Sequence, residues 1–357
     1  MKTITTKRQV STIGLDVDDH EFRAVQLIRR NSEISAHAWA IFPRLNLDDG
    51  ASEAASFLPD PHELNWAISI LQRRGFQGHE ISCVPRTRDC TQHVIELPPA
   101  DSGAPLDQLA KVEVARARKS DPNEFEIGHW PIPQRGRSNE SMAVACSKQV
   151  IDSIIEHYES GDLETVGIDL PEIAIMRGAL LTSEIKIPPT EAHIDAVLHI
   201  GWNSALAIVT LGQRIVYVRR ITTGANGVWK SACEKYGLSH RGAQAVLDDH
   251  VSTEHSDEVE RLRTACWTST AKSLSAELDV ALAYVSHSFR MSPLGKIILC
   301  GYGSQNETIR SHLDQVLGIP IVQSLPNVMQ YIESGTPSPA QSAKLTLACG
   351  LAARFDT

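Results

Sequence analysis

The sequence predicts an α/β protein built from two related lobes, and three observations lead to that prediction. Apolar segments with the pattern of strands alternate along the chain with segments of helical periodicity. The 357 residues are too many for one ordinary core and suit two domains of about 100–200 residues each. Finally, a run of strand, turn and returning strand near the start recurs about half a chain later.

The repeated unit contains three strands in each half. They are expected at residues 13–17, 22–29 and 34–41 in the first half, and at 193–200, 205–211 and 214–221 in the second. Asp16 ends the first strand of one unit, and His199 stands at the matching place in the other. Two such halves that face each other form a cleft between lobes, which is a common place for a ligand.

The other elements complete the alternating pattern. Asp60 and Pro61 have the cap and the first-turn proline of a helix start. Residues 254–292 contain neither Gly nor Pro, which favours a long helix. Further helices are expected at 106–119 and 149–160, further strands at 80–85, 165–170 and 296–300, and a polar loop at 134–140.

Charge and composition exclude some classes of function. A net charge of -9, without a readable cluster of Lys and Arg, argues against nucleic acid as a partner. The polar residues 1–12 lack the apolar core of a signal peptide. The longest apolar region, 196–218, is interrupted by His199, Asn203, Gln213 and Arg214 and is no bilayer span. We therefore expect no direct membrane insertion, and membrane association only through a partner.

The seven cysteines are scattered, and no two of them form a C-x-x-C pair. This distribution indicates reduced, packed thiols in a cytosol-like compartment, and neither a disulfide framework nor a zinc site.

The turns that follow the strands are the candidate sites for chemistry. Backbone N–H groups in tight turns bind phosphate oxygens, and glycine lets the backbone approach them. A carboxylate at the end of a strand, such as that of Asp16, can orient water on a magnesium ion.

Several segments carry a family resemblance, and they occur in the family's order and spacing. They are IGLDVDDHEFRAVQL, HEISCVPRTRDCTQHVIELPP, ETVGIDLPEIAIMRGAL, IGWNSALAIVTLGQRIVYVRRITTGAN, YGLSHRGAQAVL, KIILCGYGSQ and LACGLAARF. Together they resemble the PilM branch of the actin-like ATPases. The resemblance implies an actin-like (ribonuclease H-like) fold of two lobes with duplicated strand-hairpin-helix cores. It places the first lobe at 1–170, an inserted subdomain at about 82–148, the second lobe at 171–357 and a closing helix at about 339–355.

The resemblance also implies ATP with magnesium between the lobes. Asp16 would orient magnesium-bound water, and Arg23 stands where the family has a lysine. Further nucleotide contacts are implied for Gly201, Trp202 and Asn203 in the second phosphate turn, Gly224 behind the phosphates, and Gly301 with Gly303 beside the adenosine.

Several residues depart from the family pattern at this site. The changed positions are Asp18 and Asp19 in the first turn, His199 in place of an aspartate, and Gln244 and Leu247 in place of glutamate and lysine. A carboxylate within about 4 Å of a phosphate charge costs roughly 1 kcal/mol at the dielectric constant of water and about 4 kcal/mol at an effective value near 20. The departures therefore predict weakened nucleotide binding.

Some of these residues also have purely structural interpretations. Asp18 and Asp19 are good turn residues, and Gly301 with Gly303 would suit a tight strand-to-helix turn. Trp202 is compatible with stacking on a base or with filling an empty pocket, and the sequence leaves both open.

The function implied by the resemblance is that of a cytoplasmic scaffold in a type IV pilus or related secretion machine, at most a weak ATPase. It would bind the N-terminal cytoplasmic segment of a single-pass, PilN-like inner-membrane protein, in a groove beside the inserted subdomain, here around residues 83–147. The chain would then lie at the inner membrane through this partner. The alternatives are a nucleotide-free docking protein and a sugar or acetate kinase on the same fold. A cell-division scaffold of the FtsA type is less favoured, because residues 354–357 form no amphipathic helix.

Overall fold

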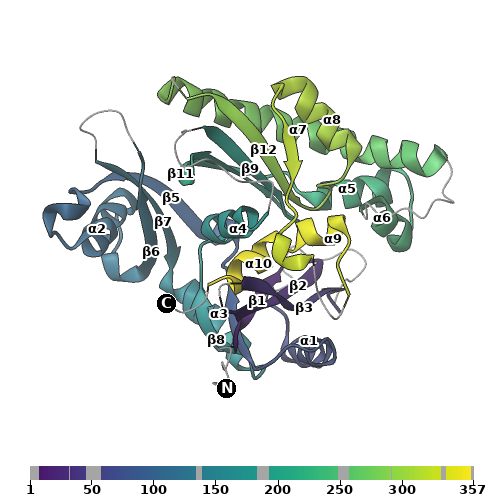
Figure 1. Ribbon diagram of the computed structural model, residues 1–357, viewed down its shortest axis with the longest axis horizontal. Coiled ribbons are helices and arrows are strands. Elements are labelled where there is room, and N and C mark those ends of the chain that lie inside the picture. The colour runs from purple at the N-terminus through teal and green to yellow at the C-terminus, as the bar shows by residue number, and fades with distance from the viewer. Residues whose placement is uncertain are drawn as a thin grey trace, which may run out of the picture.

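Two five-stranded sheets of the same topology form the two lobes of this computed structural model (Figure 1). The structure describes residues 8–31, 33–45, 58–133, 139–182, 193–247, 257–290, 292–330 and 335–354. The first sheet has the order β3-β2-β1-β4-β8, and its strands are β1 (Arg8–Val17), β2 (Glu21–Arg30), β3 (Glu33–Pro43), β4 (Glu80–Cys83) and β8 (Glu164–Ile168).

The second sheet repeats this arrangement in the order β11-β10-β9-β12-β13. Its strands are β9 (Ile194–Ile200), β10 (Ala205–Leu211), β11 (Arg214–Ile221), β12 (Leu294–Gly301) and β13 (Ile321–Gln323). In each sheet three antiparallel strands are followed by two strands parallel to the first. The duplicated core expected from the sequence is confirmed.

Helices cover the outer faces of both sheets. Helices α1 (Pro61–Arg73) and α3 (Lys148–Glu159) share a core with the first sheet. The Asp60 side chain accepts a hydrogen bond from the Glu63 N–H and caps α1, as the sequence predicts. The second sheet is covered by α5 (Ala225–Lys230), α6 (His240–Leu247), the long α7 (Asp257–Ser288) and α8 (Glu307–Leu317). Residues 254–256 of the predicted long helix lie outside the described residues.

Two helices lie between the sheets and join the lobes: α4 (Pro171–Leu180) and α10 (Thr346–Ala352). They cross at Gly178 and Gly350, where the backbones nearly touch. A Cβ on Gly178 would collide with the Thr346 carbonyl, and one on Gly350 with the Ala174 carbonyl. The apolar side chains of α4 and α10 also pack on strands of the second sheet.

The closing segment differs from the single helix expected at about 339–355. It forms two short helices, α9 (Pro339–Lys344) and α10, which are separated at Leu345. The Leu345 N–H is shared between the carbonyls of Gln341 and Ser342, so the last turn of α9 tightens before α10 begins. Residue 355 lies outside the described range.

An additional subdomain projects from the first lobe (Figure 1, left). Its sheet has the order β5-β7-β6, with β5 (Cys90–Glu96), β6 (Phe125–Pro131) and β7 (Glu140–Ser147). Helix α2 (Leu106–Arg118) packs on one face of this sheet, and the other face is turned toward the two lobes. Residues 134–138 of the predicted polar loop lie outside the described residues.

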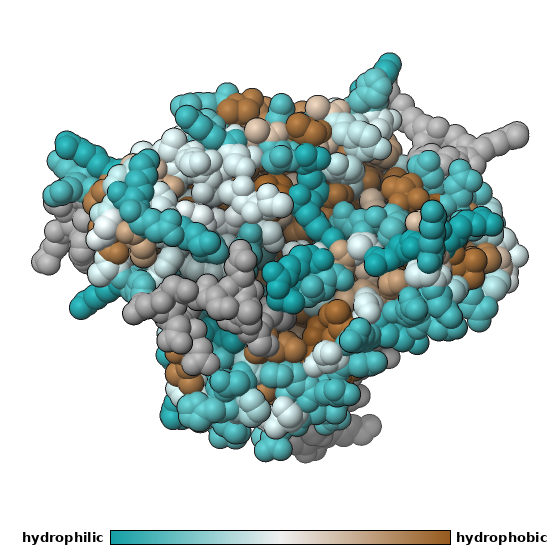
Figure 2. All heavy atoms as spheres, turned by 180° about the vertical axis from the view of Figure 1, so that it is seen from behind, coloured by the Kyte–Doolittle hydropathy of each residue, from teal (hydrophilic) through white to brown (hydrophobic). Residues whose placement is uncertain are grey.

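The surface matches the composition of an ordinary globular protein. Figure 2 shows a face that is mostly hydrophilic, with hydrophobic residues in small separate groups. No helix in the described part of the chain is long and apolar enough to cross a membrane. All seven cysteines are free thiols, and every one except Cys233 is buried.

Candidate functional site

The turns of the two repeated hairpins face each other across the junction of the lobes. In the first lobe the β1–β2 turn is closed by the Asp18 N–H, which donates to the Glu21 carbonyl at 3.2 Å. In the second lobe the Gly201 N–H donates to the Ser204 carbonyl at 3.0 Å. These are the two turns from which the sequence predicts phosphate binding.

Arg23 is the centre of a buried ionic cluster below the first turn. Its guanidinium lies 2.7 Å from a carboxylate oxygen of Asp16, 2.7 Å from one of Asp18 and 3.1 Å from one of Glu21. It also donates to the Tyr302 hydroxyl at 3.1 Å, so it reaches into the second lobe. Burial alone would lower the pKa of Arg23, but the carboxylates outweigh it and raise the pKa well above its usual value.

Asp18 is held as an anion by donors from both lobes. One carboxylate oxygen accepts the backbone N–H groups of His20 at 2.7 Å and Glu21 at 2.9 Å. The other accepts Arg23 and the Tyr302 hydroxyl, the latter at 3.2 Å. Burial would raise the pKa of Asp18, yet Arg23 and the backbone donors lower it below the usual value. The backbone donors of the first turn are therefore already engaged by a carboxylate of the chain itself.

His20 fills the space beside the second turn. Its ring stacks on that of Trp202, with centroids 4.1 Å apart and planes 5° from parallel. The Trp229 ring meets it edge-on at 5.1 Å, and its Nε2 lies 3.0 Å from the Gln244 side-chain oxygen. Burial is the main cause that lowers the pKa of His20. The Trp202 ring therefore packs on a side chain of the first lobe, and its contact with a nucleobase stays a prediction.

Asp16, the residue expected to orient magnesium-bound water, is buried and paired with Arg23. Burial raises its pKa, and Arg23 opposes this effect. Among the described residues no group of three or more His, Cys, Asp and Glu side chains has the geometry of a metal site. The side chains at this place therefore do not suit ATP with magnesium, because Asp18 occupies the anion donors and His20 the aromatic space.

The predicted glycines have packing roles of their own. Gly301 and Gly303 have φ angles of 85° and 63°, and a Cβ on Gly303 would meet the Trp267 ring at 2.5 Å. A Cβ on Gly224 would collide with the Trp202 carbonyl, so this glycine does lie directly behind the second turn. A Cβ on Gly301 would likewise meet the Ile200 carbonyl, so these three glycines are closely packed, and their contact with a nucleotide stays a prediction. The residue between Gly301 and Gly303, Tyr302, makes the contacts to the first lobe that the sequence did not predict.

A cavity of about 330 Å³ remains between the lobes, and residues of both turns line it: Asp18 and Asp19 of the first turn, and Gly201, Trp202 and Asn203 of the second. Its walls include Asp16, His199, Pro171 and Leu347. Burial, followed by the nearby positive charge of Arg23, lowers the pKa of His199 to about 3. At neutral pH this side chain is therefore an uncharged part of the wall.

A larger groove, of about 660 Å³, separates the inserted subdomain from the second lobe; we call it the subdomain groove. It is lined by Gln92, His93, Val94, Ile132, Glu140 and Met142 on one side and by Val216, Tyr217, Val218, Tyr284, Val285, Ser288 and Phe289 on the other. Val94 is 57% exposed and Tyr284 60% exposed, which is unusual for large apolar side chains.

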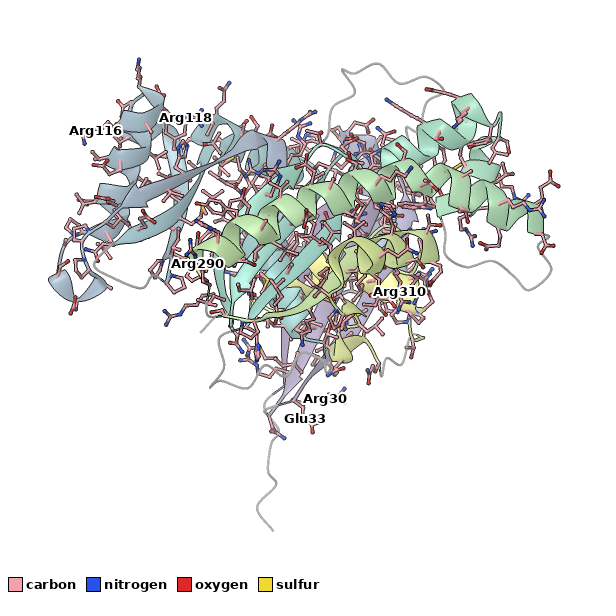
Figure 3. All side chains as sticks on the ribbon, turned by 90° about the horizontal axis from the view of Figure 1, so that it is seen from above. Arg30, Glu33, Arg116, Arg118, Arg290 and Arg310 are labelled. Atoms are coloured by element: carbon pink, nitrogen blue, oxygen red, sulfur yellow. The ribbon has the colours of Figure 1, made fainter. Side chains whose placement is uncertain are left out.

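The sequence anticipated the subdomain side of this groove but not its second wall. The buried stripe of α7 runs through Leu274, Leu278 and Leu282, whereas Val280 and Tyr284 lie off that stripe and are exposed. This i, i+4 apolar pair outside the core stripe is the signal that was available in the sequence. Figure 3 labels Arg290 just beyond the end of α7, on the side of the inserted subdomain.

One network fixes the subdomain against both lobes at the base of the groove. Glu172, which is fully buried in α4, accepts Gln92 of β5 at 3.1 Å and Arg220 of β11 at 3.3 Å. Arg220 also donates to the Cys90 carbonyl. Removal of Glu172 would leave the Arg220 charge without its carboxylate, so we regard this network as the structural base of the groove.

The comparisons with known proteins agree with this architecture. Residues 125–355 match the model of the family described as type IV pilus assembly protein PilM. The protein in a structure titled PilM-PilN type IV pilus biogenesis complex is 18% identical, with a TM-score of 0.71 over 96% of this chain and 98% of that chain. The ethanolamine utilization protein EutJ from Carboxydothermus hydrogenoformans is 12% identical, with a TM-score of 0.51 over 96% and 89%.

A third similar structure is the archaeal actin homolog Ta0583, which is 10% identical with a TM-score of 0.47 over 96% of this chain and 98% of that chain. No curated protein matches the sequence. The family match covers well over half of the chain, and the duplicated sheets have the topology that the resemblance implied. The chain has the actin-like fold and belongs to the PilM family of type IV pilus assembly proteins.

Proposed function

We propose that this protein is a scaffold of a type IV pilus or related secretion machine, that it works without nucleotide turnover, and that it docks the N-terminal cytoplasmic segment of a PilN-like inner-membrane protein. The observation that carries the proposal is the subdomain groove, an open apolar groove in a member of the PilM family. The similar structure with the highest TM-score given above is titled as a complex of PilM with PilN.

The groove has the properties of a site for an extended peptide. In the part of the chain that the structure describes, β11 pairs only with β10 and stands at the edge of its sheet; one carbonyl of β11, that of Ile215, accepts the indole N–H of Trp130 from the subdomain. A peptide that adds to such an edge gains main-chain hydrogen bonds, and its alternate side chains enter pockets. Val94 and Tyr284 provide apolar contacts on opposite walls. The matching ligand is a short, mainly apolar segment in extended conformation.

The ion pairs at the first turn support the proposed absence of nucleotide turnover. Phosphoryl transfer needs positive charge and a positioned nucleophile around the γ-phosphate. Here Asp16 and Asp18 stand at this place, and their partner Arg23 is committed to both. This arrangement argues against the sugar or acetate kinase and supports the nucleotide-free docking protein.

The proposed location is the cytoplasmic side of the inner membrane. The described residues contain no helix that could span a bilayer, so in this proposal the partner supplies the anchor. A docked segment of a membrane protein would hold the chain at the membrane surface without any insertion of its own.

The test is the binding of a fluorescent peptide with the sequence of the cognate partner's cytoplasmic segment, followed by anisotropy. Val94→Asp places a charge on the groove wall, and we expect it to weaken binding at least about tenfold, because the charge must be desolvated beside an apolar ligand. Val316→Asp is the matched control, since Val316 is 48% exposed on α8 and does not line the groove.

We expect Val316→Asp to bind the peptide within twofold of the unchanged protein. Equal binding by the two variants would refute the groove as the docking site. The absence of binding by the unchanged protein would refute the proposed partner.

A further inference from the structure

The contact between the two hairpin turns is made by side chains that reach from one lobe into the other. We call it the interlobe clasp: Asp18 and His20 of the first lobe with Trp202, Gln244 and Tyr302 of the second. Each of these contacts joins a side chain of one lobe to a side chain of the other.

The Asp18 carboxylate takes the place of a bound anion. Tight turns bind phosphate through consecutive backbone N–H groups together with a nearby cation. At Asp18 the donors are the N–H groups of His20 and Glu21, at 2.7 and 2.9 Å, and the cation is Arg23 at 2.7 Å. The Tyr302 hydroxyl adds a donor from the opposite lobe at 3.2 Å. These donors are the kind that bind a phosphate, but the anion that they hold here is the Asp18 carboxylate.

The His20 imidazole takes the place of a flat aromatic ligand. It lies parallel to Trp202 at 4.1 Å, and Trp229 and Tyr302 approach it from two further directions at 5.1 and 6.3 Å. One ring nitrogen lies 3.0 Å from the Gln244 oxygen. Stacking in an aromatic slot, combined with one directional hydrogen bond, is the way in which a nucleobase is commonly held.

Further contacts extend this connection between the lobes. Asn203 donates to the Asp19 carboxylate across the junction. Lys344 of the closing segment lies 3.7 Å from Glu21 and 4.7 Å above the Tyr302 ring. Lys344 is the last residue of α9, so the residues around the clasp also contact the segment that leads into α10.

We propose that Asp18 and His20 are a built-in substitute for a nucleotide, with the carboxylate in the role of a phosphate and the imidazole in the role of a base, and that they hold the two lobes closed in the absence of any ligand. In this protein a closed form that would otherwise require a bound nucleotide is made permanent by two side chains. The inference concerns lobe closure and does not depend on the identity of the docked partner.

The experiment measures nucleotide binding and lobe closure on the full chain. Calorimetric titration of the unchanged protein with ATP and magnesium is combined with hydrogen exchange of the segments around residues 199–205 and 300–305. For the unchanged protein we expect no binding of ATP up to millimolar concentration. We also expect hydrogen exchange in these segments to be the same with and without ATP. We expect His20→Ala and Asp18→Asn to raise exchange in these segments at least about tenfold, because each removes contacts from the first lobe.

Matched controls are His79→Ala and Asp101→Asn, which alter exposed residues of the first lobe outside the clasp. Both controls should exchange like the unchanged protein. Micromolar ATP binding by the unchanged protein would overturn the inference, because the nucleotide would then displace the side chains. Exchange at the unchanged rate in folded His20→Ala and Asp18→Asn would also overturn it. If a variant fails to fold, Gln244→Ala is measured in its place. We expect this substitution to raise hydrogen exchange in the same segments, by less than His20→Ala. An unchanged exchange rate in Gln244→Ala would also overturn the inference.

Discussion

The two junctions of the molecule differ in almost every physical property. The interlobe clasp is made of paired side chains: Asp18 and His20 are largely buried and bonded to groups of the opposite lobe, and Arg23 connects Asp18 with Tyr302. The subdomain groove is open, and it exposes Val94 and Tyr284 to solvent. The charged groups of the clasp are already paired within the chain, whereas an open apolar groove loses unfavourable hydration when a ligand covers it. The comparison sets an exposed apolar surface, at which we propose partner docking, against a paired and largely buried contact, which we propose holds the lobes together.

The largest effect that tests this comparison is expected at Arg23. Arg23→Met removes the cation shared by Asp16, Asp18 and Glu21 and leaves uncompensated carboxylates in a buried place. Loss of one partner from a buried ion pair costs about 3–5 kcal/mol in the free energy of unfolding. Urea unfolding followed by circular dichroism measures the change.

Arg73→Met is the control for this experiment, since Arg73 is exposed at the end of α1 and its loss should cost less than about 0.5 kcal/mol. If Arg23→Met lowered the free energy of unfolding by less than about 1 kcal/mol, the ionic cluster would be well solvated. The clasp beside it would then not be a rigid junction.

The sequence revealed the elements of both junctions but only part of their contacts. Alternating strands with turn residues between them predicted both hairpins, because these patterns are local. His20 is a turn residue in the sequence, and its partners Trp202 and Gln244 lie about half a chain away, so no local pattern could predict the stack. The groove was anticipated on the subdomain side, and its second wall required the docking of α7 against the second sheet.

An intermediate effect is expected at the crossing of the two joining helices. Gly350→Ala places a Cβ against the Ala174 carbonyl of α4, and backbone atoms cannot yield as a flexible side chain can. Overpacking of this kind costs about 1–3 kcal/mol. Gly227→Ala is the matched control, because its Cβ would meet nothing within 4 Å in α5. In a helix this change stabilises by about 0.5–1 kcal/mol.

Opposite signs for the two glycine variants, read from urea midpoints, would confirm that α4 and α10 join the lobes by direct backbone contact. If both variants changed the free energy of unfolding in the same direction, the connection through α4 and α10 would not be rigid. The lobes would then be able to slide on each other.

The smallest effect is the pH dependence contributed by His199, at the wall of the interlobe cavity. Its pKa is about 3 in the folded protein and 6.5 without perturbation, so the unfolded chain binds the proton first as the pH falls. The folded state is therefore favoured above pH 6.5, and the stability declines as the pH falls toward 3. Between pH 6.5 and 5.5 the expected loss is about 1 kcal/mol. His199→Gln removes this contribution, so the difference in unfolding free energy between the two proteins should change by that amount over the interval.

A difference that stays constant with pH would mean that water reaches His199 freely, and the cavity wall would then resemble the open groove more than the clasp.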